Sequence, residues 1–199
     1  MARRVYIFEN PDRFVAAAVG QPGSRAFYLQ AREGTRVITV ALEKVQVALL
    51  AERLTEMLAE VRSRGADVPD EPPAAEVDRA PLEEPLVETF RVGTMAIVWD
   101  GDDESVVVEA RQIADDEDEI DEIDEIDEVD EADEANEAAT EVSDEDSDLM
   151  RVHLEPRQAL AFAARALEVV AAGRPPCPFC GQPLNPEGHI CARRNGYMH

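Results

Sequence analysis

Apolar residues recur at helical spacing between residues 43 and 64. They stand three or four positions apart and are Leu50, Leu54, Met57, Leu58 and Val61. This spacing puts them on one face of an α-helix, with charged residues such as Glu52 and Glu56 mostly off that face. Gly65 follows the stripe and suits a helix end, because glycine readily adopts the left-handed conformation found there. The pattern predicts an amphipathic helix over residues 43–64.

Short apolar runs separated by turn residues precede this helix, over residues 3–40. The turns are expected at residues 10–12, 20–24 and 33–35, where Pro, Gly, Asn and Asp gather. Turns this short join neighbouring strands in antiparallel order. The first part of the chain therefore predicts short antiparallel strands that lead into the helix, and we expect three of them to form a meander.

The same order of patterns occurs again later in the chain. Strands are predicted at residues 90–99, 105–111 and 149–154, and a helix from Pro156 to about Ala172. An offset of 112 residues places Leu42-Glu43 on Leu154-Glu155, and Gln46 on Gln158. The sequence thus predicts a tandem repeat of one strand–helix unit.

Two polar segments interrupt this pattern. Residues 66–86 are rich in proline and acids and are expected to form an extended, mobile linker. Residues 115–148 contain 21 acidic residues and neither Lys nor Arg, within a loop of the second unit. Such a dense run of like charges repels itself, which predicts a disordered insert on the surface. A docking tail for a basic partner is the alternative.

The predicted fold class is α+β, with two layers. Each unit is a three-strand antiparallel meander plus a helix, and both helices are expected to cover one antiparallel sheet. The expected organisation is a first βββα unit at residues 1–65, the linker at 66–86 and a second βββα unit at 87–173. A small zinc knuckle at 174–199 completes the chain.

The net charge and the hydropathy of the chain argue against some classes of function. The net charge of the chain is -25, and the acidic insert alone carries -21, which leaves only -4 on the rest of the chain. This balance argues against a nucleic-acid-binding surface. No apolar run approaches the length of a membrane span, and the N-terminus lacks the apolar segment of a signal peptide. We therefore expect a cytoplasmic protein.

The clearest chemistry lies near the C-terminus. All three cysteines fall within residues 177–191 and, with one histidine, give the candidate metal ligands Cys177, Cys180, His189 and Cys191. Three sulfurs and one nitrogen are the number and type of ligands that tetrahedral zinc takes, whereas buried or redox-active thiols are the alternative. With four protein ligands no position stays open for water, so the expected role of the zinc is structural.

A second set of polar residues recurs in both units. The first unit has Glu43, Gln46 and Arg53, and the offset of 112 places them on Glu155, Gln158 and Arg165. Caps of the two helices are one interpretation of the Glu and Gln positions. A ligand or partner site between the units is the other.

The C-terminal residues Cys177-Pro-Phe-Cys180-Gly181-Gln-Pro-Leu184, followed by Pro186-Glu-Gly-His189-Ile-Cys191, resemble the closing signature of an uncharacterised actinobacterial family of repeat proteins. Residues 27–34 and 42–44 are also similar to its first half. This resemblance implies a repeat and a metal site. The genes of that family are usually found near genes for a phosphoinositide-kinase-like protein and a histidine-phosphatase-like protein. The family has no assigned activity, so the resemblance implies none for this chain.

Two function classes follow from these observations. The first is a non-catalytic zinc-containing binding or adaptor module, because the metal site is closed and no nucleophile constellation is visible. The second is an enzyme or small-ligand-binding protein with its site between the two units. If the repeated polar residues converge on one pocket, the enzyme or ligand-binding protein is favoured. If they lie apart as helix caps, the non-catalytic binding module is favoured.

Overall fold

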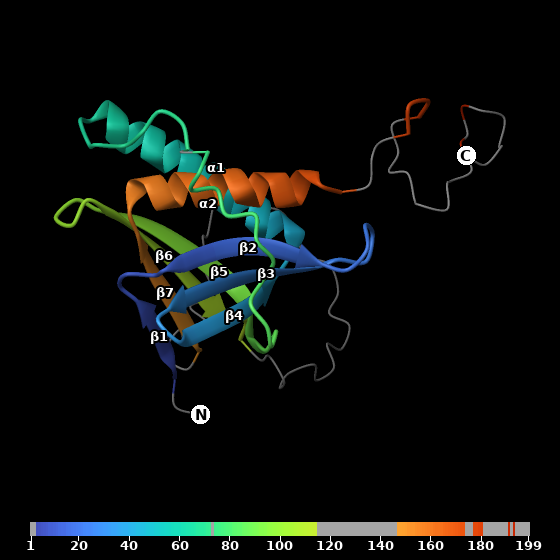
Figure 1. The fold of residues 1–199 in the computed structure, drawn as a ribbon, viewed down its shortest axis with the longest axis horizontal. Helices are drawn as coiled ribbons and strands as arrows, with labels where there is room; N and C mark the ends of the chain where they lie inside the picture. The colour runs from blue at the N-terminus through green and yellow to red at the C-terminus, as the bar shows by residue number, and fades with distance from the viewer. Residues whose placement is uncertain are drawn as a thin grey trace, which may run out of the picture.

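A computed structural model of the chain describes residues 3–72, 74–114, 147–173, 177–180, 191 and 193. Within these residues the fold is a mixed α+β arrangement of seven strands and two helices (Figure 1). In chain order the elements are β1 (Val5–Phe8), β2 (Arg13–Val19), β3 (Ala26–Glu33), β4 (Arg36–Leu42), α1 (Lys44–Ser63), β5 (Glu88–Asp100), β6 (Ser105–Gln112), β7 (Leu149–Leu154) and α2 (Pro156–Ala171).

The seven strands form one sheet in the order β1-β7-β6-β5-β4-β3-β2. Strands β2, β3 and β4 pair antiparallel, as do β5, β6 and β7. Two pairings are parallel, however: β1 with β7 and β4 with β5. The expectation of a purely antiparallel sheet is therefore wrong. Alternation of apolar residues reports that a strand is half-buried, but not which neighbour it pairs with.

Strand β5 changes partner along its length. Its start pairs with β4, with Glu88 opposite Thr39, and its remainder pairs with β6. A register shift between Val92 and Thr94 interrupts the pairing with β6 near its start. Gly93 stands at this bulge, where a Cβ atom would lie 2.8 Å from the Cα of Ile113. Glycine is therefore needed for the close approach of the two backbones.

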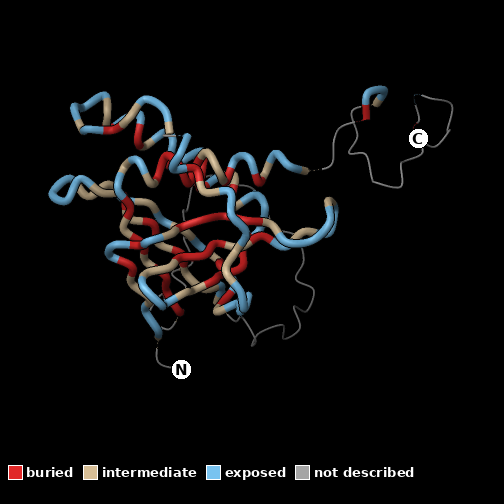
Figure 2. Tube along the Cα trace, viewed as in Figure 1, coloured by how far each residue is buried: buried red, intermediate tan, exposed pale blue. Residues whose placement is uncertain are grey.

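The two helices pack against each other over one face of the sheet (Figure 1). Buried residues run along the strands and the helices, whereas the turns are exposed (Figure 2). A single apolar cluster joins the sheet to both helices. Within it Phe14 of β2 stacks on Phe162 of α2 with ring centroids 4.5 Å apart. This core fixes α2 beside β2, far from it in sequence.

Both helices begin with the same capping arrangement. Glu43 precedes α1 and Glu155 precedes α2, each in an extended conformation. The Glu43 backbone N–H donates to Gln46 Oε1 at 2.7 Å, and the Glu155 N–H donates to Gln158 Oε1 at 3.0 Å. Each glutamate side chain in turn accepts from the third helical N–H. Reciprocal bonds of this kind satisfy backbone donors that the first helical turn leaves unpaired.

The segment between α1 and β5 packs on the folded core. Val68 and Val77 are buried, and the backbone N–H of Glu83 donates to Gln30 Oε1 at 2.8 Å. Arg13 of β2 pairs with Asp78. An extended, mobile linker was expected from composition alone. Side chains of β2 and β3 supply polar partners that the local sequence does not reveal.

Most of the acidic insert lies outside the described residues, but its last two residues do not. Asp148 is buried and accepts a hydrogen bond from the Arg4 backbone N–H on Oδ1 at 2.8 Å. Its Oδ2 lies 3.1 Å from Arg4 Nε. Asp148 thus joins the start of β7 to the residue before β1. The expectation that this position is solvated with the rest of the tract is wrong.

Replacing Asp148 with alanine is expected to lower the free energy of unfolding by about 1–3 kcal/mol, because the Arg4 backbone N–H loses a buried, charged acceptor. Denaturant unfolding measures this. Asp102→Ala, in the exposed β5–β6 turn, is the matched control and should stay within about 0.5 kcal/mol of wild type. Equal, negligible losses for both variants would show that the Asp148 contact does not anchor β1.

Glu109 of β6 is half-buried and contacts two arginines, Arg111 and Arg151. Burial raises its pKa, but hydrogen bonds and charges from Arg151 and Arg111 outweigh burial and hold the pKa below the usual range. Glu109 Oε1 lies 2.7 Å from Arg151 Nε, and its side chain is 14% exposed. A lowered pKa stabilises the fold above the unfolded-state value, and the contribution disappears as pH falls.

The Glu109→Gln variant should therefore be less stable than wild type at pH 7, by about 1–3 kcal/mol. The difference should shrink as the pH falls below about 4.3, the unfolded-state pKa of glutamate. Thermal unfolding of both proteins between pH 3 and pH 7 measures it. A difference that is constant over this range would contradict the assigned role of the Glu109 charge.

Candidate functional site: a cysteine cluster and a polar pocket

The three cysteines of the C-terminal segment lie together. The Sγ atoms of Cys177, Cys180 and Cys191 are all within 4.8 Å of one another. Cys177 Sγ and Cys191 Sγ are 4.0 Å apart, and both residues are buried, while Cys180 is half-buried. Residues fourteen positions apart in sequence thus place their sulfurs in one small volume.

This spacing fits a shared metal ion. Two sulfurs bound to one tetrahedral zinc at about 2.3 Å each stand about 3.8 Å apart. The 4.0 Å between Cys177 and Cys191 is close to that value and about twice the S–S bond length of a disulfide, roughly 2.05 Å. The three thiols can therefore hold a metal ion, and their softness suits zinc and other thiolate-binding metals. His189, the expected fourth ligand, lies outside the described residues.

The repeated polar residues of the first unit lie apart from the cysteines. Glu43 and Gln46 cap α1, and the Gln46 amide nitrogen also donates to the carbonyls of Val92 at 3.2 Å and Gly93 at 3.0 Å. Arg53 is 64% exposed and pairs with Glu56 on the same helix. Glu43 and Gln46 thus support the start of α1, and Gln46 also supports its contact with β5, whereas Arg53 makes only an exposed pair within the helix.

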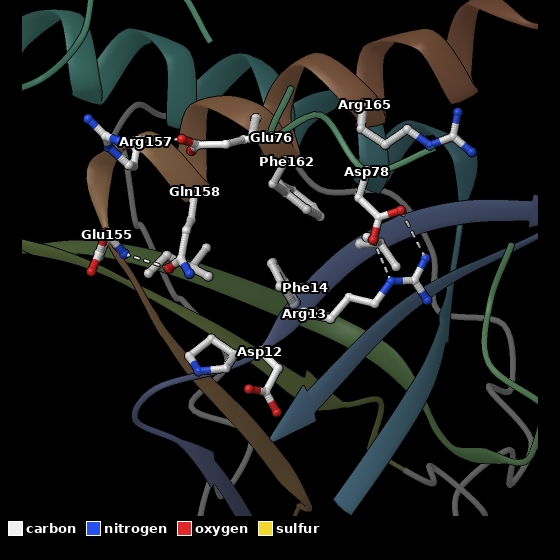
Figure 3. A pocket seen from close by; sticks show the side chains of 14 residues that line it. Asp12, Arg13, Phe14, Glu76, Asp78, Glu155, Arg157, Gln158, Phe162 and Arg165 are labelled. Carbon is white, nitrogen blue, oxygen red and sulfur yellow. Dashed lines mark hydrogen bonds and ion pairs between the residues drawn. The ribbon is translucent and has the colours of Figure 1, made fainter. Parts of the chain in front are cut away.

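Their counterparts on α2 line a pocket. Glu155, Gln158 and Arg165 are among the residues that line a cavity of about 430 Å³ between β2, α2 and residues 74–80 (Figure 3). The structure therefore does not bring the six residues together in one place. It places three of them at a pocket, and Arg53 on the exposed side of α1.

The pocket combines an apolar wall with charged side chains. Phe14 and Phe162 form the wall, and Arg13, Arg157 and Arg165 surround it together with four carboxylates. Two of these carboxylates, Glu76 and Asp78, come from the segment that precedes β5 (Figure 3). The cavity is thus bounded by parts of the chain from before and after β5.

The two arginine–carboxylate pairs of the pocket differ in strength. Arg13 makes two contacts with the Asp78 carboxylate: its Nε lies 2.5 Å from Oδ2 and its Nη2 lies 3.3 Å from Oδ1. The hydrogen bond from Arg13 lowers the pKa of Asp78 despite a partial burial that raises it. Arg157 makes a single contact with Glu76 at 3.3 Å. The Arg13–Asp78 pair is therefore a stable part of the fold, whereas the Arg157–Glu76 pair is weakly held.

Sequence reasoning missed Arg13, Glu76 and Asp78. Arg13 and Asp78 are 65 positions apart, and the two acids lie in a proline-rich segment that composition marks as a linker. The repeat offset selects only residues that occur twice, so it could not find them. Their one sequence signal is the apolar Val77 between the two acids, which the structure buries.

No helix among the described residues is long and apolar enough to cross a membrane. Comparisons with curated proteins and with solved structures found no match. A family model described as "Protein of unknown function (DUF3090)" matches residues 6–191. That match spans β1 to the last cysteine of the cluster, so the chain belongs to the DUF3090 family of proteins of unknown function.

Proposed function

We propose that this protein is a non-catalytic binding or adaptor protein with one structural zinc ion, and that it works in the cytoplasm. The zinc ligands in this proposal are Cys177, Cys180, His189 and Cys191. The observation that carries it is the convergence of the three Sγ atoms within 4.8 Å. Its partner is a protein or a small ligand, and neither a membrane nor a nucleic acid.

A structural role follows from the proposed ligand set. Catalytic zinc keeps one coordination position for water or substrate, whereas four protein ligands fill a tetrahedral site. Burial of Cys177 and Cys191 supports the same role, since it shields two of the sulfurs from solvent. In this proposal the zinc stabilises the C-terminal knuckle.

We further propose that the chain is a tandem repeat, with units at residues 1–65 and 87–173. The support is threefold. Each unit contains a three-strand meander followed by a helix, and both helices carry the same Glu–Gln cap. The last strand of each meander, β4 or β7, also pairs in parallel with a strand segment from the other unit.

A second candidate function is the binding of a small ligand between the two units. The observation that favours it is the pocket itself, because β2 supplies one wall, α2 another and residues 74–80 a third. Its volume of about 430 Å³ lies in the range of small-molecule sites, roughly 300–1,000 Å³. This candidate is compatible with a structural zinc elsewhere in the chain.

Elemental analysis of the purified protein tests the leading proposal. We expect one zinc per chain after exhaustive dialysis against metal-free buffer, because a closed thiolate site holds zinc tightly. Protein that is reduced and folded but contains no zinc, and that takes none up on titration, would contradict it.

A further inference from the structure

We propose that the pocket between β2 and α2 binds a small carboxylate ligand through Arg157 and Gln158, and that Glu76 occupies part of this site as an internal competitor. This inference rests on the second candidate function and names the chemical class of its ligand. Two features of the described residues carry it: a spare amide donor and a loosely held arginine.

The spare donor is visible when the two helix caps are compared. Both glutamines use Oε1 to accept from the backbone N–H of the capping glutamate. Gln46 then donates its amide protons to the carbonyls of Val92 and Gly93. Among the described residues Gln158 has no such acceptor, and its side chain lines the pocket (Figure 3). A ligand oxygen can therefore occupy the place that backbone carbonyls take beside α1.

Arg157 is the second donor that a ligand can reach. Its contact with Glu76 is a single one at 3.3 Å, and the two side chains are 55% and 37% exposed. Exposed pairs of this kind contribute little to stability, so exchange of Glu76 for another carboxylate costs the protein little. Arg13 is different, since its side chain is 10% exposed and it makes two contacts with Asp78. Arg13 therefore remains with Asp78.

The other carboxylates of the pocket are already engaged. Asp12 Oδ2 accepts from the Gly34 backbone N–H at 2.7 Å, and Glu155 accepts from the third N–H of α2. Each of these carboxylates keeps further acceptor sites, so the hydrogen bonds alone do not exclude a cation. A carboxylate ligand instead meets donors that are spare or only loosely paired, Gln158 and Arg157, and this favours the anion.

Phe14 and Phe162 bound the pocket beside these donors. Phe162 lies between Gln158 and the Arg13–Asp78 pair, with Phe14 against it (Figure 3). Both rings are already buried, with Phe14 9% and Phe162 3% exposed, so they leave a ligand little apolar surface to cover. The ligand class is thus a small organic acid, recognised through its carboxylate.

Phenylacetate is a suitable probe, with phenethylamine as its cationic counterpart. Titrations followed by protein amide NMR shifts should show that phenylacetate perturbs residues of β2 and α2, and that phenethylamine binds at least tenfold more weakly. Glu76→Gln should tighten phenylacetate binding about two- to fivefold, since it removes the internal competitor. The matched control is Glu56→Gln, which breaks a similarly exposed pair with Arg53 on α1 and should leave the Kd unchanged.

Gln158→Glu separates binding from folding. Glutamate also serves at this position of a capping box, so the melting temperature should be kept, whereas the amide donor is replaced by a negative charge. Phenylacetate binding should weaken at least tenfold. An unchanged Kd in Gln158→Glu or in Glu76→Gln, with the probe still in the pocket, would overturn this inference but leave a ligand pocket. Absence of binding by either probe to every variant would overturn both proposals.

Discussion

Replacing Leu54 with alanine is expected to lower the free energy of unfolding by roughly 2–5 kcal/mol, the usual range for emptying a core leucine site. Leu54 lies in α1 with no exposed surface and belongs to the cluster that joins both helices to the sheet. Denaturant unfolding followed by the fluorescence of Trp99, the one tryptophan of the chain, measures the loss. A neutral result would contradict the two-layer packing of α1 on the sheet.

Arg53→Ala is the matched control, one residue away on the same helix. Its side chain is 64% exposed and its partner Glu56 is 67% exposed. Such pairs contribute at most about 1 kcal/mol, so the variant should unfold almost as wild type does. A large loss for Arg53→Ala would show that this exposed face of α1 supports the fold.

Replacing Cys180 with serine is the second change with a large expected effect. The variant should lose most of its zinc, because a hydroxyl is a much poorer zinc ligand than a thiolate. His189→Ala should do the same, while His153→Ala, a histidine in β7, should keep one zinc per chain. Elemental analysis of the purified proteins gives the answer. Zinc content equal to wild type in Cys180→Ser would exclude the proposed ligand set.

The same variant separates the metal site from the core. None of the three cysteines belongs to the apolar cluster under the helices. The unfolding midpoint of the sheet and helices should therefore change little in Cys180→Ser, even though zinc is lost. A shift as large as that of Leu54→Ala would show that the cysteine cluster supports the core directly.

Local patterns along the chain predicted the helices well. The stripe that contains Leu54 predicted α1 within about one residue at each end, and Pro156 marked the start of α2. The glutamate–glutamine spacing indicated both caps, which the structure confirms. These features depend on residues within one or two turns of each other, so the sequence displays them directly.

Features that depend on distant residues were not predictable in this way. The pairing of β1 with β7 joins strands more than 140 positions apart, and the partners of Asp148 and Asp78 lie in β1 and β2 or next to them. Nothing in the acidic and proline-rich segments distinguishes these two acids from their neighbours. The tertiary fold selects them because it brings an arginine to each.

Of the candidate site residues, some could likewise be found from the sequence and others only from the structure. Spacing alone pointed to Cys177, Cys180 and Cys191, which the structure brings together. The repeat offset identified both Gln46 and Gln158 as candidate site residues, but it could not distinguish between them. Only the structure shows that the Gln46 amide is used within the fold, whereas the Gln158 amide lines a pocket. A difference between two copies of one motif is thus a clue that sequence symmetry conceals.

X-ray absorption at the zinc edge of the purified protein tests the proposed closed metal site most directly. The expected spectrum fits three sulfur ligands at about 2.3 Å and one nitrogen at about 2.0 Å, with four-coordinate geometry. This result would match Cys177, Cys180, Cys191 and His189 as the complete ligand set. A water oxygen in the coordination shell, or fewer than three sulfurs, would contradict a closed structural site.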